Sequence, residues 1–269
     1  MIAIPVTLAL LFLLFLLSLM GRRGHKDLPK LRGWAYAHRG LHGKGRPENS
    51  MSAFQAALDG GYGIELDVHL MQDGNLAVIH DASLKRTAGA DVKIEDLTLE
   101  DLDNYCLEDT GEKIPTLQQV LELFAGKAPI ILELKSERGN YAALCHTACA
   151  AMEDYKGYFC MESFDPRCVG WLRKNRPDIL RGQLSANFLK DKESALPWHL
   201  KFAMTYLLPN FLTMPDFVAY EFANRKSLGV TLCRRLWGLQ GVTWTVTSQQ
   251  DFDTAVQEGY LPIFEKFRP

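Results

Sequence analysis

The chain has 269 residues and a formal net charge of −2; 47% of its residues are hydrophobic and 23% are charged. These values are ordinary for a folded globular protein and exclude a disordered chain. The near-neutral charge and the lack of any long basic run argue against a nucleic-acid partner. Cysteines spread over a chain of this size do not resemble a secreted disulfide framework, so we expect reduced thiols.

The N-terminal residues differ in composition from the rest of the chain. Residues 2–20 carry no charge and are dominated by Leu, Phe, Ala and Ile, and about 20 apolar residues are needed to span a bilayer as a helix. A secretory signal would have a basic start and a small-residue cleavage site, and neither is present. A buried core helix fits poorly because the segment has no polar face. We therefore expect a transmembrane anchor over residues 1–21.

Basic residues follow this apolar segment, and none precede it. They lie within residues 22–33, which we interpret as a juxtamembrane linker suited to anionic lipids. They are Arg22, Arg23, Lys26, Lys30 and Arg32. The positive-inside rule then places the remaining domain, residues 34–269, in the cytoplasm. The pattern predicts a single-pass protein of the cell membrane.

From Trp34 onward, short apolar runs alternate with amphipathic stretches. The apolar runs predict strands at residues 34–38, 63–70, 76–80, 130–135, 158–163, 179–184, 217–220, 242–247 and 262–265. Helices are predicted between most of them, at residues 50–58, 117–124, 167–175, 224–236 and 249–258. Repeated strand–helix units over roughly 240 residues match an α/β fold with a closed (β/α)₈ TIM barrel. One predicted strand is surplus to such a barrel.

One connection breaks the alternation of strands and helices. Asp73 and Gly74 are a strong signal for a two-residue hairpin turn. With these two residues as the turn, Asp67 lies opposite His80, and directly opposed residues share a face of the sheet. This register would bring His80 beside the carboxylates of Glu65 and Asp67.

Polar residues gather at the ends of several predicted strands, where barrel enzymes keep their functional groups. They are His38 and Arg39 with Asn49 shortly after, Glu65 and Asp67, His80, and Glu133 with Lys135. Glu65 and Asp67 share one strand face, because side chains alternate, while Leu66 packs on the other. Solvated carboxylates on an edge strand would be a simpler explanation, as would a structural ion pair of Glu133 and Lys135.

Taken together, these groups favour metal-assisted phosphoryl chemistry. Carboxylate oxygens suit a hard cation, Mg²⁺ or Ca²⁺, over Zn²⁺. Two histidines can divide the work of a general base and a general acid. An arginine and a lysine can neutralise a phosphoryl group as its charge develops.

The order of these motifs resembles the glycerophosphodiester phosphodiesterase family in its bacterial form. The matching elements are His38-Arg39-Gly40, Pro47-Glu48-Asn49-Ser50, Glu65-Leu66-Asp67-Val68, Asp73-Gly74, His80-Asp81, Ile114-Pro115-Thr116-Leu117, Glu133-Leu134-Lys135, Ser163-Phe164-Asp165 and Trp244-Thr245-Val246. Three features depart from the pattern: Ser50 stands where many relatives carry Thr, Thr247 stands where many carry Asn, and the acidic residue expected near the C-terminal Pro269 differs, with Glu265 ending the last strand instead.

The resemblance implies a TIM barrel that holds one divalent cation, Mg²⁺ or Ca²⁺, and hydrolyses glycerophosphodiesters to an alcohol and glycerol phosphate. It implies that the metal ligands are Glu65, Asp67 and Glu133, that the catalytic acid–base pair is His38 and His80, that Arg39 and Lys135 contact the phosphate, that Asn49 orients groups near the site, and that Trp244 forms a wall of the substrate pocket. It leaves open which histidine is the base.

Two other functions were weighed against this one. A non-catalytic binding barrel is disfavoured because every ionisable group of the family pattern is present. Lysophospholipase D-type cleavage of lysophospholipids at the membrane is the second alternative, suggested by the predicted anchor and by the apolar stretch Ala195–Phe217. Prolines interrupt that stretch, so it either packs over the barrel rim or forms a lipid-facing lid.

Overall fold

The computed structural model describes residues 3–108 and 110–269, and its strands form one sheet that closes on itself. The strands are β1 (Tyr36–His38), β2 (Gly63–Leu70), β3 (Leu76–Val78), β4 (Ile130–Leu134), β5 (Phe159–Ser163), β6 (Arg181–Ser185), β7 (Phe217–Glu221), β8 (Gln240–Val246) and β9 (Tyr260–Phe264). Their order is β1-β9-β8-β7-β6-β5-β4-β2-β3, and a parallel β1–β2 pairing closes the ring. All strands except β3 are parallel to their neighbours, which confirms the predicted barrel and identifies β3 as the surplus strand.

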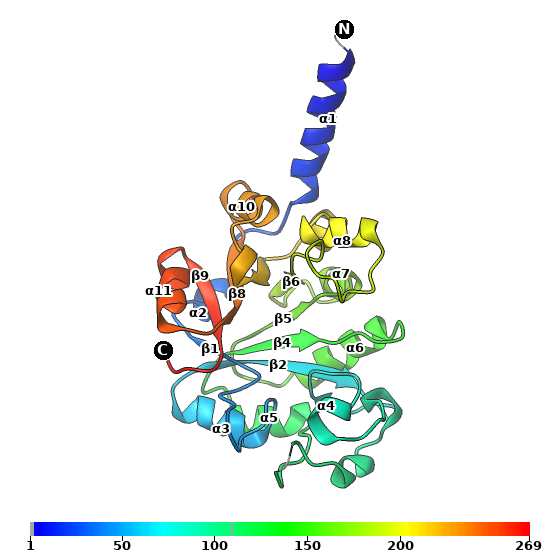
Figure 1. Ribbon diagram of the computed structural model, residues 1–269, viewed down its shortest axis with the longest axis vertical. Helices are drawn as coiled ribbons and strands as arrows, with labels where there is room; N and C mark the ends of the chain where they lie inside the picture. Colours follow the sequence, from blue (N-terminus) through cyan, green and yellow to red (C-terminus); the bar gives the residue numbers. More distant parts are fainter. Residues whose placement is uncertain (1–2, 109) are drawn as a thin grey trace.

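Helices surround the barrel, as Figure 1 shows. The α-helices between barrel strands are α3 (Met51–Asp59), α4 (Lys85–Ala88), α5 (Leu117–Phe124), α6 (Tyr141–Ala151), α7 (Pro166–Asn175), α8 (Trp198–Thr205), α9 (Asn210–Thr213), α10 (Leu228–Arg235) and α11 (Gln249–Gln257). Local signals in the sequence fix several of their ends. The Ser50 side chain accepts a hydrogen bond from the backbone N–H of Ala53 at the start of α3, and Thr116 and Gln119 form a capping box on α5.

The strands separate two hydrophobic cores. Ile64, Leu66 and Val68 of β2 pack outward, against the surrounding helices. Tyr36 and Ile131 lie in the cluster inside the barrel. Side chains alternate along a strand, so the residues that share the inward face with Tyr36 and Ile131 are the polar ones predicted to form a site.

The predicted register of the hairpin between β2 and β3 is wrong by one residue. Val68 pairs with Val78, and the backbone N–H of Ile79 donates to the carbonyl of Asp67, so Asp67 is not opposite His80. The loop has three residues, not two, because Met71 and Asn75 still pair at its ends. Gly74 takes the left-handed conformation, with φ of 87°, that three-residue hairpin loops commonly use.

The prediction of a membrane-spanning anchor is also wrong. Within residues 3–108 and 110–269, no helix is both long and apolar enough to cross a membrane. Helix α1 (Ala3–Ser18) has 16 residues, and at about 1.5 Å per residue it is about 24 Å long, shorter than the bilayer core of about 30 Å. The prediction of a single-pass cell-membrane protein depended on this anchor and is therefore wrong as well.

The apolar run ends early as a helix because its last residues pack on the barrel. Leu19 is fully buried among residues that include Leu207 and Val218. The indole N–H of Trp237 donates to the carbonyl of Leu16 over 2.9 Å. Figure 1 shows the rest of α1 extending away from the barrel.

The basic segment that follows α1 also packs on the barrel. Both oxygens of the buried Asp216 carboxylate accept hydrogen bonds of 2.6 Å from the Arg22 guanidinium. Leu28 and Leu31, the ends of the short helix α2 (Leu28–Leu31), enter the core inside the barrel. This core lies below the carboxylates, so α2 covers the amino-terminal end of the barrel.

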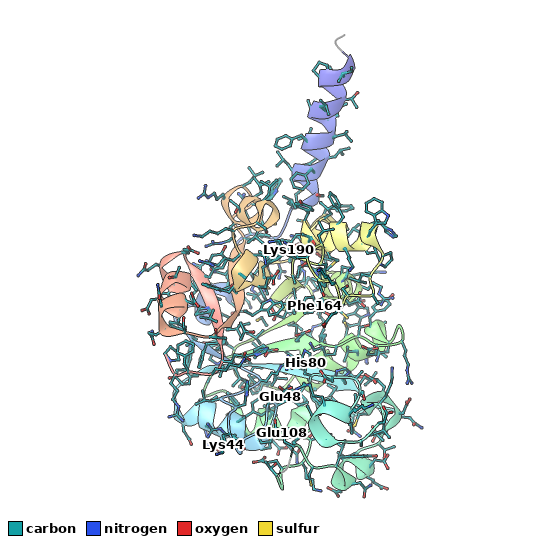
Figure 2. All side chains as sticks on the ribbon, viewed as in Figure 1. Lys44, Glu48, His80, Glu108, Phe164 and Lys190 are labelled. Carbon is teal, nitrogen blue, oxygen red and sulfur yellow. The ribbon has the colours of Figure 1, made fainter. Side chains whose placement is uncertain are left out.

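The apolar stretch Ala195–Phe217, predicted either to pack over the barrel rim or to form a lid, is partly buried and partly exposed. It lies in the long β6–β7 connection and supplies α8 and α9. Met204 and Leu207 are buried, whereas Trp198 is 76% exposed. In Figure 2 the labelled Lys190 of this connection lies above the labelled Phe164. Phe188 of the connection meets Phe164, the residue that follows β5, edge to face. The connection therefore packs beside the carboxyl-terminal end of β5 while leaving apolar side chains on the surface.

Candidate active site

The inward polar residues line one cavity of about 220 Å³ at the carboxyl-terminal ends of the strands. Its walls are formed by His38, Arg39, Glu65, His80, Glu133, Glu162, Phe164, Leu184, Trp244 and Ile263. Six of the nine residues predicted for the site are among them. The other three, Asn49, Asp67 and Lys135, contact this group directly. All nine predicted residues are therefore brought together, from positions 38 to 244 of the chain.

A row of buried carboxylates crosses three adjacent strands. Asp67, Glu133 and Glu162 are direct neighbours in the strand register, and they are 1%, 6% and 1% exposed. Glu65 lies one step lower on β2, beside His38 of β1. So many acids in one buried place repel one another unless a cation compensates them.

The carboxyl groups show this repulsion in their pKa values. Burial, reinforced by Asp67 and Glu133, raises the pKa of Glu65 well above its usual value. Burial likewise raises the pKa of Glu133 to about 7, although Lys135 opposes the shift. For Asp67, burial is outweighed by Lys135, His80 and Arg39, so its pKa is well below normal. Of Glu65, Asp67 and Glu133, Asp67 is therefore the carboxyl group that ionises most readily.

Three of these carboxylates have the geometry of a hard-cation site. Ligand oxygens of Glu65, Asp67 and Glu133 all lie within 4.8 Å of one another. Oxygens that bind one Ca²⁺ at 2.3–2.6 Å can be up to about 5 Å apart across the ion, so this spacing fits. Asp67 Oδ1 is paired with Lys135 Nζ at 3.0 Å. The donor set, three buried carboxylates at this spacing, fits a divalent cation.

Lys135 supplies the positive charge nearest to this cluster. Its Nζ lies 2.6 Å from Glu133 Oε1, and the ammonium is almost fully enclosed. Burial would lower the pKa of Lys135, but Asp67 and Glu133 raise it further than burial lowers it. The ion pair that the sequence suggested as a simpler explanation is thus present, and it lies inside the cavity's acidic row.

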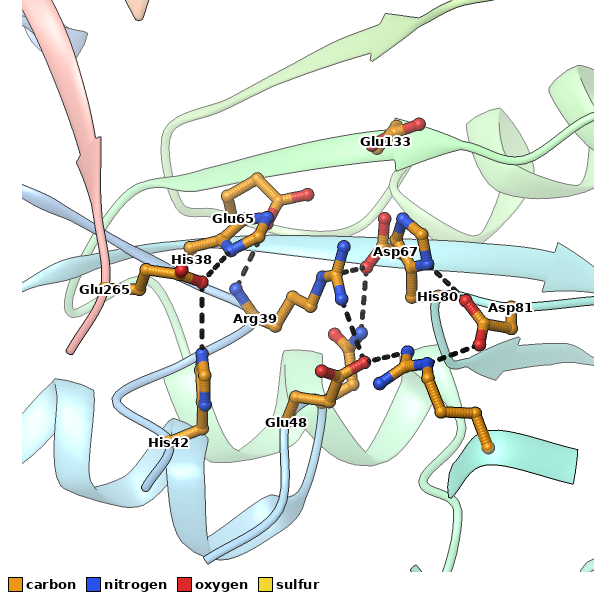
Figure 3. Close-up of polar contacts among 12 residues, drawn as sticks. His38, Arg39, His42, Glu48, Glu65, Asp67, His80, Asp81, Glu133 and Glu265 are labelled. Atoms are coloured by element: carbon orange, nitrogen blue, oxygen red, sulfur yellow. Dashed lines mark hydrogen bonds and ion pairs between the residues drawn. The ribbon is translucent and has the colours of Figure 1, made fainter. Parts of the chain in front are cut away.

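The imidazole of His38 is held by a carboxylate from the last strand. Its Nδ1 is 2.9 Å from Glu265 Oε2, and its Nε2 faces Glu65 at 3.9 Å (Figure 3). Burial lowers the pKa of His38, while the hydrogen bond to Glu265 opposes this. The hydrogen bond from His38, with the His42 imidazole 3.7 Å away on the other side, holds the pKa of Glu265 far below normal, so this carboxylate is ionised. With Nδ1 engaged, Nε2 is the nitrogen free to exchange a proton.

His80 has the same arrangement on the opposite side of the cavity. Its Nδ1 lies 2.6 Å from Asp81 Oδ1, and Asp81 also accepts a 2.6 Å hydrogen bond from Arg86. Burial, with Lys135 and Arg39 nearby, lowers the pKa of His80 to about 4. His80 is therefore neutral at pH 7 in the protein without substrate.

Arg39 and Asn49 support the acidic cluster from the loop after β1. Arg39 Nε is 3.4 Å from Asp67 Oδ2, while Asn49 donates a 2.9 Å hydrogen bond to the same oxygen. Both residues have positive φ angles, 53° and 55°, which asparagine tolerates better than arginine does. A hydrogen bond of 2.9 Å from the backbone N–H of Asn49 to the carbonyl of Arg39 ties the two together.

Two carboxylates that the sequence did not identify complete the site. Glu162 lines the cavity and its Oε2 has no hydrogen-bond partner, so burial raises its pKa well above normal. Alternation of side chains along β5 could have predicted that Glu162 points inward, as its register neighbour Glu133 does. Glu265 was noted only as a strand end, because nothing local shows that β9 pairs with β1 and brings it to His38.

The remaining wall of the cavity is apolar. Phe164 and Trp244 meet edge to face, with ring centroids 5.7 Å apart. Leu184 and Ile263 lie beside them. Trp244 Nε1 is buried without a hydrogen-bond partner. An indole N–H in this state is available to a substrate oxygen.

Comparison with known proteins agrees with this geometry. A family model described as the glycerophosphoryl diester phosphodiesterase family matches residues 38–265. A glycerophosphodiester phosphodiesterase of Caldanaerobacter subterraneus subsp. tengcongensis is 31% identical over 236 residues, which cover 83% of this chain and 89% of the relative.

Solved structures share the fold at lower identity. A phosphodiesterase of Oleispira antarctica, in complex with the product sn-glycerol-3-phosphate, superposes with a TM-score of 0.71 at 20% identity, covering 87% of this chain and 93% of that one. A glycerophosphodiester phosphodiesterase of Thermotoga maritima superposes with a TM-score of 0.66 at 24% identity, covering 86% and 93%.

Proposed function

The chain belongs to the glycerophosphoryl diester phosphodiesterase family, and we propose that it hydrolyses glycerophosphodiesters to an alcohol and glycerol phosphate at the cavity described above. The observation that carries this proposal is the position of His38 and His80, each held by a carboxylate, on either side of a buried acidic cluster. That arrangement supplies two proton-transfer groups and a place for a cation around one reacting centre.

We assign the cation site to Glu65, Asp67 and Glu133, whose oxygens suit Mg²⁺ or Ca²⁺. A divalent cation there would neutralise phosphoryl oxygens and lower the pKa of a nearby hydroxyl of the substrate. Asn49 holds Asp67 in place through its 2.9 Å hydrogen bond. Such supporting contacts fix the orientation of metal ligands.

His38 acts as the base in this proposal. It accepts the proton of the glycerol hydroxyl next to the phosphate, and the hydroxyl oxygen attacks phosphorus. The ionised Glu265 stabilises the imidazolium that forms, because its hydrogen bond reaches His38 Nδ1. Asp81 supports His80 less well, since Arg86 shares its charge. This difference favours His38 over His80 as the base.

His80 acts as the acid. The bond from phosphorus to the head-group alcohol breaks, and His80 protonates the departing alkoxide to leave a cyclic phosphate. Water then opens the ring with the two roles reversed. Arg39 and Lys135 stabilise the added negative charge. A bound phosphodiester adds an anion beside His80, which raises the pKa of His80 from its low value in the protein without substrate.

The test is an assay of the purified full-length chain with glycerophosphocholine, glycerophosphoethanolamine and glycerophosphoglycerol. We expect release of the head-group alcohol and glycerol phosphate, loss of turnover with a chelator, and recovery with Mg²⁺ or Ca²⁺. Undiminished turnover in the chelator would contradict the cation assignment. No hydrolysis of any of the three diesters with either ion present would contradict the proposed function itself.

A further inference from the structure

An apolar groove of about 630 Å³ adjoins the proposed active site. Its walls are Phe164, Asp165, Pro166, Arg167, Phe188, Leu196, Leu200 and Met204. Phe164 also lines the catalytic cavity, so one aromatic ring separates the two spaces. In Figure 2 the labelled Phe164 lies between the labelled His80 and Lys190.

A second apolar hollow, of about 420 Å³, continues from this groove. The two share Pro166 and Arg167 at the start of α7, and the second runs on past Ala203 to Phe211 and Leu212. The catalytic cavity, the groove and the hollow therefore lie next to one another in that order, with Phe164 between the first two and Pro166 and Arg167 between the last two.

The groove is a fixed part of the fold. Its outer wall, α8, is tied to the barrel because Ser185 Oγ donates a 2.7 Å hydrogen bond to the carbonyl of Met204. The Tyr220 hydroxyl donates a 3.0 Å hydrogen bond to the carbonyl of Thr205. The groove is thus formed before any ligand arrives, as small-molecule sites usually are.

The lining of the groove is mainly apolar, and its two charged side chains neutralise each other. Asp165 and Arg167 are its charged residues, and they pair with each other at 2.8 Å. Phe188 meets Phe164 edge to face, with centroids 5.9 Å apart. Leu196 and Leu200 on the rim are 37% and 43% exposed, and an apolar chain lying along the groove would cover them.

We propose that this groove binds the hydrocarbon chain of a monoacylated glycerophosphodiester while its phosphodiester occupies the catalytic cavity. The inference rests on the proposed function, because the same site would cleave the phosphodiester. The occupant follows from the adjacency of the two spaces at Phe164: a ligand that fills both needs an anionic phosphodiester at one end and a flexible apolar chain at the other. Hydrolysis would break the bond between phosphorus and the head-group oxygen and leave the acyl ester intact.

The test compares glycerophosphocholine with 1-acyl-glycerophosphocholines of six, eight and ten acyl carbons, each below the concentration at which it forms micelles. Choline release is measured with the full-length chain. Full burial of a methylene gives about a fourfold gain, so an open groove should raise kcat/KM by about twofold for each added methylene. A kcat/KM that does not rise with chain length, while glycerophosphocholine is still cleaved, would overturn this inference and leave the proposed function standing.

Variants connect the chain-length effect to the groove. Leu200→Asn and Leu196→Asn should flatten the dependence on chain length without changing kcat/KM for glycerophosphocholine. Leu228→Asn is the matched control, since Leu228 is 56% exposed on α10, away from the groove. An equal chain-length slope in all three variants would overturn the assignment. So would a dimer, seen by light scattering, that Leu200→Asn dissociates, because the groove would then be an interface between copies.

Discussion

The two sides of the catalytic cavity are built from different chemistry. On the side of β1, β2 and β4, the wall consists of charged or titratable groups such as the buried Glu65 and Glu133 and the mostly buried His38. On the side of β6 and β8, it consists of Leu184 and Trp244, and the apolar groove opens beyond it. Both walls are formed at the carboxyl-terminal ends of barrel strands. The difference between the wall proposed to carry the reaction and the wall proposed to select the substrate therefore comes from the side chains and not from the topology.

The groups of the charged wall depend on one another, whereas those of the apolar wall do not. Lys135 contacts both Asp67 and Glu133, and removal of one partner leaves a buried charge unpaired. Phe164 and Trp244 meet only through ring edges. Changes on the charged wall should therefore have large effects on turnover, and changes on the apolar wall should have small effects on substrate binding.

The largest effects are expected at the two histidines. His38→Ala and His80→Ala should each lower kcat for glycerophosphocholine by about 10²–10⁴-fold, the usual contribution of a general acid or base. Steady-state kinetics measure the loss. His146→Ala is the control, since His146 is an exposed histidine on α6. Near-normal turnover in both variants would remove the acid–base pair.

A substrate with an activated leaving group separates the two histidines. A nitrophenyl phosphodiester of glycerol needs no acid, because nitrophenolate leaves without a proton. His80→Ala should regain activity with this substrate, and His38→Ala should not. Rescue of His38→Ala alone would reverse the two assignments.

The carboxylates should have the next largest effect, on cation binding. Glu65→Gln and Glu133→Gln should each weaken Mg²⁺ or Ca²⁺ binding by at least about tenfold, since even contacts that only orient a ligand are worth that much. Calorimetry measures the affinity, with Glu122→Gln on the exposed face of α5 as the control. If Glu65→Gln loses affinity and Glu133→Gln does not, Glu133 serves only as the partner of Lys135.

Alternation and motif order were sufficient to predict most of this arrangement. All nine strands were predicted to within a few residues, and the count showed that one was surplus, but only the strand pairing identified it as β3. The inward positions of Glu65 and Asp67 followed from the period of two along β2. These features are local, so the sequence near each residue contains the information.

Features that depend on distant contacts were missed. The α1 helix ends at Ser18 because Leu19 is needed in a core formed with Leu207 and Val218, which an apolar count cannot reveal. Glu265 lies beside His38 only because the barrel closes. The hairpin register shifted because a three-residue loop replaced the expected two-residue turn.

Replacement of Glu162, which lies where the charged wall and the apolar wall meet, should change the stability of the fold. Burial raises its pKa, so the folded chain keeps a proton that the unfolded chain releases above about pH 4.5. Unfolding therefore releases this proton, and the carboxyl lowers stability as pH rises from about 4.5. Glu162→Gln should raise Tm at pH 8 by a few degrees, about 2–4 °C per kcal/mol, with the gain shrinking toward pH 4.5.

Thermal unfolding of both proteins in chelator, from pH 4.5 to 8, measures this gain. A gain that does not depend on pH would show that the amide side chain of the variant simply packs better than the acid. A loss of stability at pH 8 would show that the ionised carboxylate has a partner in solution. Turnover of the same variant shows whether Glu162 contacts substrate, because a residue that only lowers the stability of the fold can be replaced without loss of activity.

The smallest effect should come from Trp244, and it tests what the apolar wall selects. An aromatic face attracts a quaternary ammonium group by about 0.5–2 kcal/mol, which corresponds to roughly two- to thirtyfold in binding. Trp244→Leu should therefore raise KM for glycerophosphocholine within that range and leave kcat nearly unchanged. For glycerophosphoglycerol, which has no cation in its head group, KM should change less. Trp171→Leu on α7 removes an indole outside the cavity and should alter neither value.

If Trp244→Leu raised both KM values equally, the wall would act through shape and burial alone. If it lowered kcat as strongly as His38→Ala does, the unpartnered indole N–H of Trp244 would belong with the charged wall, and the division between the two sides would fail.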